Sequence, residues 1–244
     1  FETSKGEVIQ LCDAVPHGLG GSAFWKSVDG GNTWKDLGRD ESGKLRKNPW
    51  FFKGWKGAWI AGIHAGAVEL KDGRFMALGR ANNIRHKMPM SISEDDGKTW
   101  NYFPSEFPTI TYGQRLVLKR LREGPILLAS FTDSVKISGS KMYKFLKGMD
   151  MKTLSGETKR CYGLFVALSL DEGKTFPIRR FLDCSKGSKT PRWEKGFGIK
   201  TPILIDETHG ELKGYLAGTQ SPDGIIHIIS SRIHYRFNLK WLLS

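Results

Sequence analysis

The chain of 244 residues has little cysteine and no long apolar run. Its three cysteines, Cys12, Cys161 and Cys184, lack metal-binding spacing, and an odd number cannot complete a disulfide framework, although one bridge is possible. No stretch approaches the ~18 consecutive apolar residues of a membrane helix. These absences argue against a zinc module, a disulfide-stapled scaffold and a membrane span. No metal and no cofactor are expected.

Long runs with helical periodicity are also missing. Short runs of β-forming residues alternate instead with Gly, Asp and Asn, and the chain contains 29 Gly, 8 Trp and 14 Phe. Hydrophobic residues make up 39% of the chain and charged residues 26%, which is enough apolar content for a globular core. This pattern predicts an all-β protein.

Acidic residues are few relative to basic ones. The chain has 25 Asp and Glu against 38 Lys and Arg, a net charge of +13. Such a balance attracts anionic partners. Much of the positive charge lies between Lys136 and Lys200, which we interpret as a solvated, lysine-rich insertion. No helix-turn-helix, zinc-finger or RNA-binding signature accompanies the charge, so we expect an anionic carbohydrate rather than nucleic acid.

Three octets nearly repeat one another: SVDGGNTW from Ser27, SEDDGKTW from Ser93 and SLDEGKTF from Ser169. Each reads Ser-x-Asp-x-Gly-x-Thr-aromatic, and they start 66 and 76 residues apart. We predict that each turns a third strand into a fourth. Gly supplies the backbone angles, Ser and Asp bind nearby amides, and the aromatic side chain packs between sheets. The predicted structural residues are Ser27, Asp29, Gly31, Trp34, Ser93, Asp95, Gly97, Trp100, Ser169, Asp171, Gly173 and Phe176.

The sequence around each octet predicts four antiparallel strands, the blade of a β-propeller. One blade is expected from residue 63 to about 104, and another from 114 to about 182. Before them, EVIQLCDAV and GSAFWKS are expected to form a second and a third strand. After them, GYLAGTQSPDGIIHIISSR is expected to form a first and a second strand, and YRFNLKWLL a third. The chain therefore contains about four blades, of which the first and last are incomplete.

The octets resemble the Asp boxes, or BNR repeats, of the sialidase superfamily, and the resemblance is closest to bacterial sialidase-like proteins of untested activity. It implies a six-bladed propeller of which about four blades are present. We therefore expect residues 1–244 to form a single propeller domain, the C-terminal part of a longer propeller. The alternative is a natural four-bladed ring closed by pairing of its two ends. The resemblance also implies a secreted or periplasmic protein.

Blade topology places the octets on one face of a propeller and the strand 2–3 loops and 4–1 connections on the other. In the sialidase superfamily the active site is on that second face. The second strands are expected to end at Asp13, Arg80, Asp133 and Arg232. The connections add His64, Gln114 and Arg115, and His234 and Tyr235 follow Arg232.

These side chains suggest two sets of roles. Arginines hold carboxylates through paired hydrogen bonds, and Asn and His bind sugar hydroxyls. The expected substrate-binding residues are Arg80, Arg115, Arg232, Gln114, Asn82, Asn83 and His86. The expected catalytic residues are Asp133 as acid or base, His64, and His234 with Tyr235 as an acid–base or nucleophile pair. The structural alternatives are ion pairs between the arginines and Asp13 or Asp133, a turn cap at Asp133, and a core role for His64.

The chain departs from the sialidase pattern in three ways. It has no Arg-Ile-Pro motif, Tyr235 follows Arg232 too closely, and the sequence assigns no glutamate partner to the tyrosine. These departures argue against cleavage of sialic acid itself. The resemblance and the arginines still predict a sialidase-like glycoside hydrolase that acts on an acidic or deoxy-sugar glycan, with an arginine clamp. Two alternatives are a polysaccharide lyase on the same fold, with His64 or His234 as base, and a non-catalytic glycan-binding module.

Overall fold

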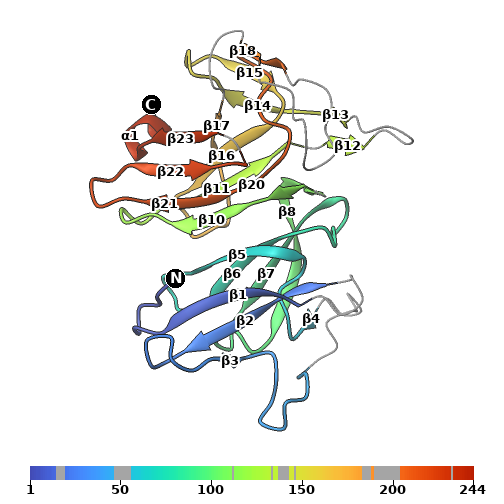
Figure 1. Cartoon of the computed structure of the whole chain (residues 1–244), viewed down its shortest axis with the longest axis vertical. Helices are drawn as coiled ribbons and strands as arrows, with labels where there is room; N and C mark the ends of the chain where they lie inside the picture. The colour runs from blue at the N-terminus through green and yellow to red at the C-terminus, as the bar shows by residue number, and fades with distance from the viewer. Residues whose placement is uncertain are drawn as a thin grey trace. The chain divides into compact units, whose positions relative to one another are not determined.

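The computed structural model describes the chain as two compact units. Unit 1 comprises 1–109 and 118–120, and unit 2 comprises 110–117 and 121–244. The described residues are 1–14, 20–46, 56–111, 113–132, 134–136, 143–145, 147–182, 188–189, 204–231 and 233–244. The boundary between the units falls in strand β10 (Val117–Arg120), the hairpin partner of β11. Each unit is built almost entirely of antiparallel strands (Figure 1).

Unit 1 contains two sheets. The first is a three-stranded meander, β1-β2-β3, and the second has five strands in the order β4-β8-β7-β6-β5. The strand bounds are β1 Val8–Ala14, β2 Gly21–Ser27, β3 Lys35–Asp36, β4 Lys56–Gly57, β5 Ile63–Glu69, β6 Phe75–Arg80, β7 Lys87–Ser93 and β8 Trp100–Pro108. The four strands predicted from residue 63 onward are confirmed, and the two-residue strand β4 adds an outer edge.

The core of unit 1 is aromatic and joins its two sheets. The Phe24 ring lies 4.9 Å from the Phe75 ring and 5.3 Å from that of Trp100, centroid to centroid. A Cβ atom added to Gly97 would lie 2.5 Å from Phe24, so the second octet also packs directly on this ring. Phe24, Phe75 and Trp100 are each at most 2% exposed. Burial of such rings is the main stabilising contribution to a small β domain.

Unit 2 also contains two blade-like sheets, in the orders β10-β11-β16-β17-β14-β15 and β21-β22-β23. Their strands are β11 Ile126–Phe131, β14 Met149–Lys152, β15 Thr158–Cys161, β16 Leu164–Ser169, β17 Ile178–Phe181, β21 Ala217–Gln220, β22 Ile226–Ile229 and β23 His234–Phe237. The remaining strands form two-stranded pairs: β9 Gln114–Arg115 with β20 Gly214–Tyr215, β12 Ser134–Lys136 with β13 Tyr143–Phe145, and β18 Ser188–Lys189 with β19 Leu204–Ile205. The chain is thus all-β with four blade-like sheets.

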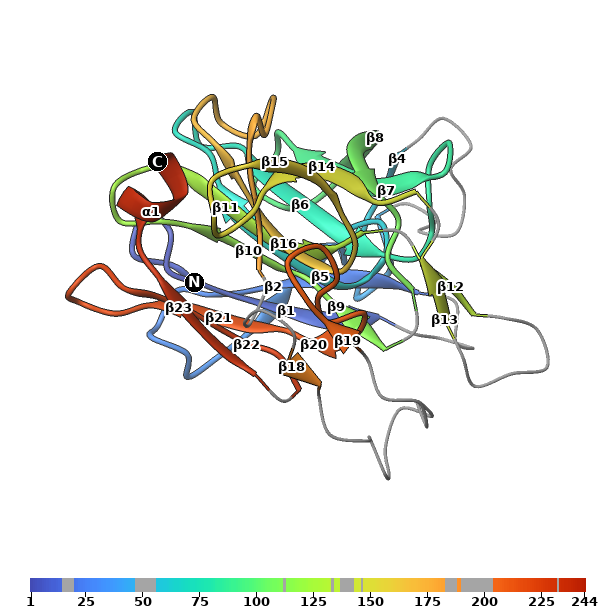
Figure 2. The ribbon, with the colours of Figure 1, turned by 90° about the horizontal axis from the view of Figure 1, so that it is seen from above.

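Two elements of unit 2 differ from the sequence expectation. The basic insertion contributes the β14–β15 hairpin, and β14 extends the sheet by running parallel to β17. The stretch predicted as one last strand divides instead into β23 and helix α1 (Leu239–Leu243), which follows β23 near the C-terminus (Figure 2). The strand prediction was wrong beyond Phe237 because the Asn238 side chain accepts a hydrogen bond from Trp241 N at 2.9 Å and caps a helix.

The three octets form the same hydrogen-bonded turn between a third and a fourth strand. In each, the Ser hydroxyl donates to the Asp carboxylate and accepts from the Gly amide at 2.8 Å. The same carboxylate accepts from the Thr amide at 2.8–2.9 Å and from the Thr hydroxyl. The octet glycines Gly31, Gly97 and Gly173 have φ between +79° and +95°. At these positions the polar side chains of each octet therefore bind within their own turn.

The aromatic residue of the octet behaves differently in its first copy. Trp100 and Phe176 are buried, as predicted, but Trp34 is 38% exposed. Its indole Nε1 donates to Gly31 O at 2.9 Å, so Trp34 folds back on its own turn. The expectation that Trp34 packs between sheets was wrong, because its indole is held against its own turn and stays partly exposed.

Cys12 is exposed and Cys161 is buried, and neither forms a disulfide with a described residue. Cys184 lies outside the described residues. No helix in the described part of the chain is long and apolar enough to cross a membrane.

Candidate functional site

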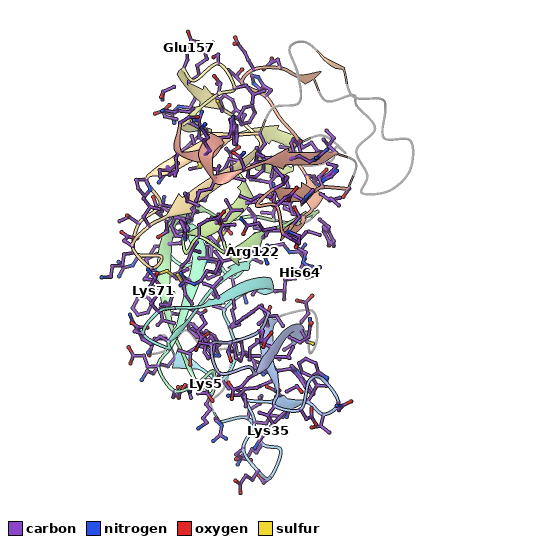
Figure 3. The ribbon with its side chains drawn as sticks, turned by 90° about the vertical axis from the view of Figure 1, so that its left-hand side faces the viewer. Lys5, Lys35, His64, Lys71, Arg122 and Glu157 are labelled. Carbon is purple, nitrogen blue, oxygen red and sulfur yellow. The ribbon has the colours of Figure 1, made fainter. Side chains whose placement is uncertain are left out.

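In unit 1, a buried serine brings the predicted site residues of two sheets together. Ser22 on β2 pairs with Asp13 across the first sheet. Its hydroxyl donates to Gly62 O at 3.0 Å and accepts from Ala65 N at 3.2 Å, which ties β2 to the segment that enters β5. The end of β1 and the start of β2 therefore lie beside the start of β5, where His64 is located (Figure 3).

His64 and Asp13 form a two-point contact. The His64 amide donates to Asp13 Oδ1 at 2.7 Å, and His64 Nδ1 lies 2.6 Å from Asp13 Oδ2. His64 has φ +51°, an uncommon backbone conformation for a residue other than glycine. Because the Asp13 carboxylate accepts a hydrogen bond from Nδ1–H of His64, the neutral ring carries its basic lone pair on Nε2. This is the geometry in which a carboxylate orients a histidine for proton transfer.

Arg80 is the last residue of β6, where the sequence placed it, and is 7% exposed. It pairs with Ile63, the residue before His64. A Cβ atom at Gly62 would meet the Arg80 backbone at 2.6 Å, and one at Gly79 would meet Ala61 O at 2.1 Å. Glycines at these two positions thus allow the end of β6 to approach the start of β5. The Asp13 carboxylate, which the sequence offered as an alternative ion-pair partner for the arginines, contacts the amide and Nδ1 of His64.

The loop between β6 and β7 carries the remaining predicted residues of unit 1. Ala81, Asn82, Arg85 and His86 all have φ between +44° and +61°. Asn82 Nδ2 donates to Gly20 O at 2.7 Å, and Asn83 Oδ1 accepts from the His86 amide at 3.1 Å. The two asparagine side chains therefore hold the loop in shape. Residues kept in such rarely populated conformations cluster at functional sites.

In unit 2, the hydroxyl of Tyr235 donates to Glu211 Oε2 at 3.0 Å. Tyr235 lies on β23 and is 7% exposed, and Glu211 lies on the segment before β20 and is 3% exposed. Sequence reasoning missed Glu211 because no strand or turn pattern marks the segment from 206 to 213. Its position in a connection that enters a first strand, the same class of position as His64, is the signal that could have found it.

The predicted pair of His234 and Tyr235 does not form, because neighbouring residues of a strand point to opposite faces. Tyr235 points to the buried side. His234 is exposed and its Nε2 lies 2.9 Å from His227 Nδ1.

Gln114 and Arg115 form strand β9. The Gln114 amide is used at both ends: Oε1 accepts from Thr111 N at 2.8 Å and Nε2 donates to Leu212 O at 2.9 Å. Gln114 is 1% exposed, so these bonds hold the segment before β20 against β9, whereas Arg115 is exposed. Asp133 and Arg232, the other two predicted residues of unit 2, lie outside the described residues.

A second polar cluster in unit 2, also missed from the sequence, lies next to Glu211 along the chain. The rings of His209 and Tyr162 stack with centroids 5.1 Å apart, and His209 Nδ1 lies 3.3 Å from Asp206 Oδ1. Burial opposes ionisation of Asp206, but hydrogen bonds from Thr208 and His209 prevail and hold its pKa below the usual range.

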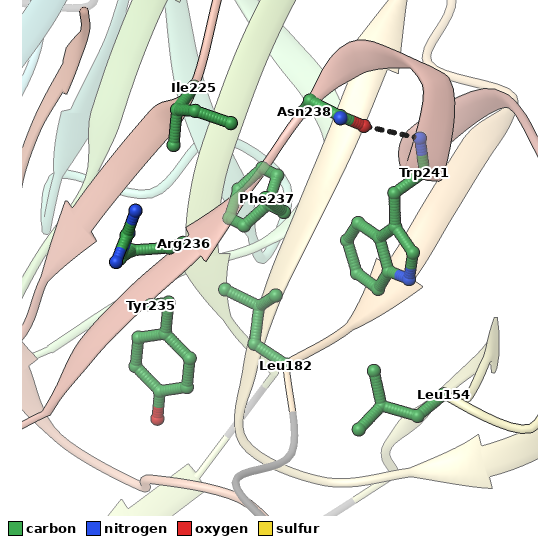
Figure 4. Close-up of a pocket in the computed structure, with 8 residues that line it drawn as sticks. All are labelled: Leu154, Leu182, Ile225, Tyr235, Arg236, Phe237, Asn238 and Trp241. Atoms are coloured by element: carbon green, nitrogen blue, oxygen red, sulfur yellow. Dashed lines mark hydrogen bonds between the residues drawn. The ribbon is translucent and has the colours of Figure 1, made fainter.

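Tyr235 also lines a pocket of about 510 Å³ in unit 2. Its apolar walls come from Leu154, Leu182, Ile225, Phe237 and Trp241 (Figure 4). The Arg180 guanidinium lies 5.1 Å from the Trp241 ring centroid, a cation–π contact that holds this wall in place. Concave apolar sites with a few polar groups are typical of ligand-binding pockets.

No family model and no curated protein matches the chain. Among solved structures, it is similar to a protein of unknown function from Dyadobacter fermentans, with 14% identity and a TM-score of 0.49; the match covers 97% of this chain and 50% of that one. It is also similar to an α-L-arabinanase from Penicillium chrysogenum, solved with arabinobiose, with 12% identity and a TM-score of 0.36; the match covers 98% of this chain and 79% of that one. The chain thus spans half the length of the first structure. Because both scores lie below 0.5, no assignment rests on them.

Proposed function

We propose that the chain is part of a glycoside hydrolase that acts on an acidic glycan, with Tyr235 as nucleophile and Glu211 as its base. The observation that carries this proposal is the 3.0 Å hydrogen bond between the Tyr235 hydroxyl and the Glu211 carboxylate. The sialidase resemblance implies a tyrosine with a glutamate partner. The Tyr235–Glu211 hydrogen bond does not involve the octets, whose Ser, Asp and Thr side chains bind one another within each turn.

The proposed reaction is a double displacement. Tyr235 Oη attacks the anomeric carbon while its proton passes to Glu211, and the glycosidic bond breaks as its oxygen takes a proton from an acid. The expected acid is Asp133. Water then cleaves the tyrosyl–sugar bond, the tyrosyl oxygen recovers its proton from Glu211, and the acid is restored by the proton of the water. A neutral tyrosine with a carboxylate partner suits an anionic substrate, because the attacking atom carries no full charge.

The acidic nature of the substrate is inferred from charge. The net charge of +13 favours anionic chains, and the two predicted arginines that belong to unit 2, Arg115 and Arg232, are proposed to hold the carboxylate. We also propose secretion or a periplasmic location, where such glycans occur.

The test is an activity panel on the purified chain, after a check that it melts cooperatively. Sialosides and uronic-acid polysaccharides are supplied, and released reducing ends are followed together with the ultraviolet absorbance of unsaturated uronates. Reducing ends without the absorbance, lost in Tyr235→Phe, support the hydrolase. Tyr102→Phe is the matched control, because it removes another buried tyrosine hydroxyl, one that donates to Trp59 O at 2.6 Å in unit 1.

A polysaccharide lyase is the second candidate, and the His64–Asp13 contact favours it. His64 Nε2 would remove the proton next to a uronate carboxylate, a double bond would form as the C–O bond breaks, and the departing glycosidic oxygen would take a proton from the imidazolium of His64. This function predicts the unsaturated product, with loss in His64→Gln and retention in Tyr235→Phe. Activity of neither kind from a well-folded chain contradicts both proposals.

A further inference from the structure

Two histidines meet on the solvent-facing side of the last sheet. His227 on β22 and His234 on β23 lie opposite Arg236 and Ile229, respectively. The interleaved residues Ile228 and Tyr235 are buried on the other side. His227 Nδ1 and His234 Nε2 are 2.9 Å apart while the ring centroids are 5.1 Å apart, so the rings meet through their nitrogen atoms rather than face to face.

The other nitrogen of His227 is held by a serine and an aspartate. His227 Nε2 lies 3.1 Å from Ser221 Oγ, and Ser221 Oγ in turn donates to Asp223 Oδ1. The single hydrogen of the Ser221 hydroxyl faces two acceptors, Asp223 Oδ1 and Ile225 O, so the hydroxyl accepts from His227 Nε2–H. In neutral His227 the lone pair is therefore on Nδ1, directed at His234. Metal-binding histidines are oriented in this way, by donating the second ring N–H to an acceptor.

We propose that His227 and His234 form a binding site for a borderline divalent transition metal ion such as Zn²⁺ or Cu²⁺. Metal–nitrogen bonds of about 2.0–2.1 Å place two ligand nitrogens at most about 4 Å apart. The observed separation of 2.9 Å thus needs to open by no more than about 1 Å, which the exposed His234 side chain permits.

The ligand set defines the class of metal. Imidazole nitrogen favours Zn²⁺, Cu²⁺ and Ni²⁺ over Ca²⁺ and Mg²⁺, which take oxygen ligands. Among the described residues, no group of three His, Cys, Asp or Glu side chains gathers around an ion. The ion is therefore bound by two imidazoles, with water at the remaining positions. Without metal, a hydrogen bond joins the two nitrogens.

The test is isothermal titration of the untagged full chain with zinc chloride in a non-chelating buffer, and with magnesium chloride for comparison. We expect one equivalent of Zn²⁺ to bind and no Mg²⁺. His227→Gln and His234→Gln should each weaken binding at least tenfold. Ser221→Ala should weaken it by about tenfold, the usual effect of removing a partner of a metal-binding histidine. His86→Gln, which changes an exposed histidine of unit 1, should have no effect.

A spectroscopic measurement on the unmodified chain covers the case in which a variant fails to fold. Cu²⁺ bound at the site should give an electron paramagnetic resonance spectrum with hyperfine splitting from two imidazole nitrogens. The proposal is contradicted if Zn²⁺ does not bind, if either histidine variant binds as well as the original chain, or if bound Cu²⁺ has no paired imidazole signal. In those cases the two histidines share a hydrogen bond and nothing more.

Discussion

The two units carry polar pairs of different character on similar sheets. In unit 1 the His64–Asp13 pair is half-buried, and its histidine has φ +51° beside a loop with four more positive φ angles. In unit 2 both members of the Tyr235–Glu211 pair are at most 7% exposed, and the tyrosine lies on a regular strand. The first pair is suited to exchanging protons with a ligand, and the second to holding a hydroxyl ready to react.

The octets, in contrast to these polar pairs, are alike in the two units. The octets are built alike in both units, down to the Ser–Asp and Thr–Asp hydrogen bonds. The polar pairs instead come from the connections that enter first strands and from the ends or starts of other strands. Because the octet turns are nearly the same in each copy, we look for the residues that differ in function among the connections and strand ends.

The largest expected effect is on catalysis in unit 2. Tyr235→Phe should lower kcat at least about 10³-fold, because it removes the nucleophile. Initial rates on the glycan substrate measure this. The variant also leaves buried Glu211 without this donor, so its melting temperature must be measured beside that of Tyr102→Phe. If Tyr235→Phe melts normally and keeps its activity, Tyr235 is structural.

The second prediction concerns the loss of stability when the aromatic residue of each octet is replaced by alanine. Trp100→Ala in unit 1 and Phe176→Ala in unit 2 should each cost about 3–5 kcal/mol of unfolding free energy, because each leaves a cavity in a packed core. Trp34→Ala should cost less than about 1 kcal/mol, because this side chain is partly exposed. Denaturant unfolding measures all three. Equal costs at Trp34 and Trp100 would mean that the first octet is packed as the others are.

A smaller effect is expected from the pair in unit 1. Asp13→Asn removes the carboxylate that orients His64, and we expect less than about a tenfold loss of hydrolase activity, because Tyr235 carries the covalent step. A loss of about 10²–10⁴-fold would instead identify His64 as an acid or base in the reaction. The pH–rate profile separates the cases, since a catalytic His64 adds an ionisation that the variant shifts.

The smallest effect is the dependence of stability on pH. Hydrogen bonds from Thr33 and Ser27 lower the pKa of Asp29 from its ordinary value of 3.8 to about 2. At Asp95 and Asp171 burial opposes the shift, but hydrogen bonds from Thr99 and Thr175 prevail and the pKa is again lowered. Because the folded state has the lower pKa, this contribution is complete above about pH 4 and is lost as pH falls toward 2.

Thermal melting between pH 5 and pH 2 checks this expectation. Asp95→Asn, which cannot ionise, should melt at a lower temperature at pH 5 and lose less stability on acidification. An unchanged acid dependence would mean that other carboxylates dominate.

The sequence predicted the scaffold well because the octets and strand alternation are local signals. Eight residues suffice to define the turn, and Ser93, Asp95 and Gly97 behave as expected from side-chain chemistry alone. The contacts between residues that lie far apart in the sequence could not be predicted in this way. Glu211 lies 24 residues before Tyr235, and no local pattern relates them. For Asp13 the sequence suggested only an alternative role as ion-pair partner of the arginines. It did not suggest the contact with His64, because the Ser22 link between β2 and the segment that enters β5 depends on packing between two sheets.

Trapping of the covalent intermediate tests whether Tyr235 is the nucleophile. The chain is incubated with a 3-fluorosialosyl fluoride, in which the second fluorine slows hydrolysis of the tyrosyl–sugar bond, and the peptides are then mapped by mass spectrometry. We expect one sugar adduct on Tyr235 in the original chain, and none in Tyr235→Phe. An adduct on another residue of an active chain, or turnover of the substrate without any adduct, would contradict it.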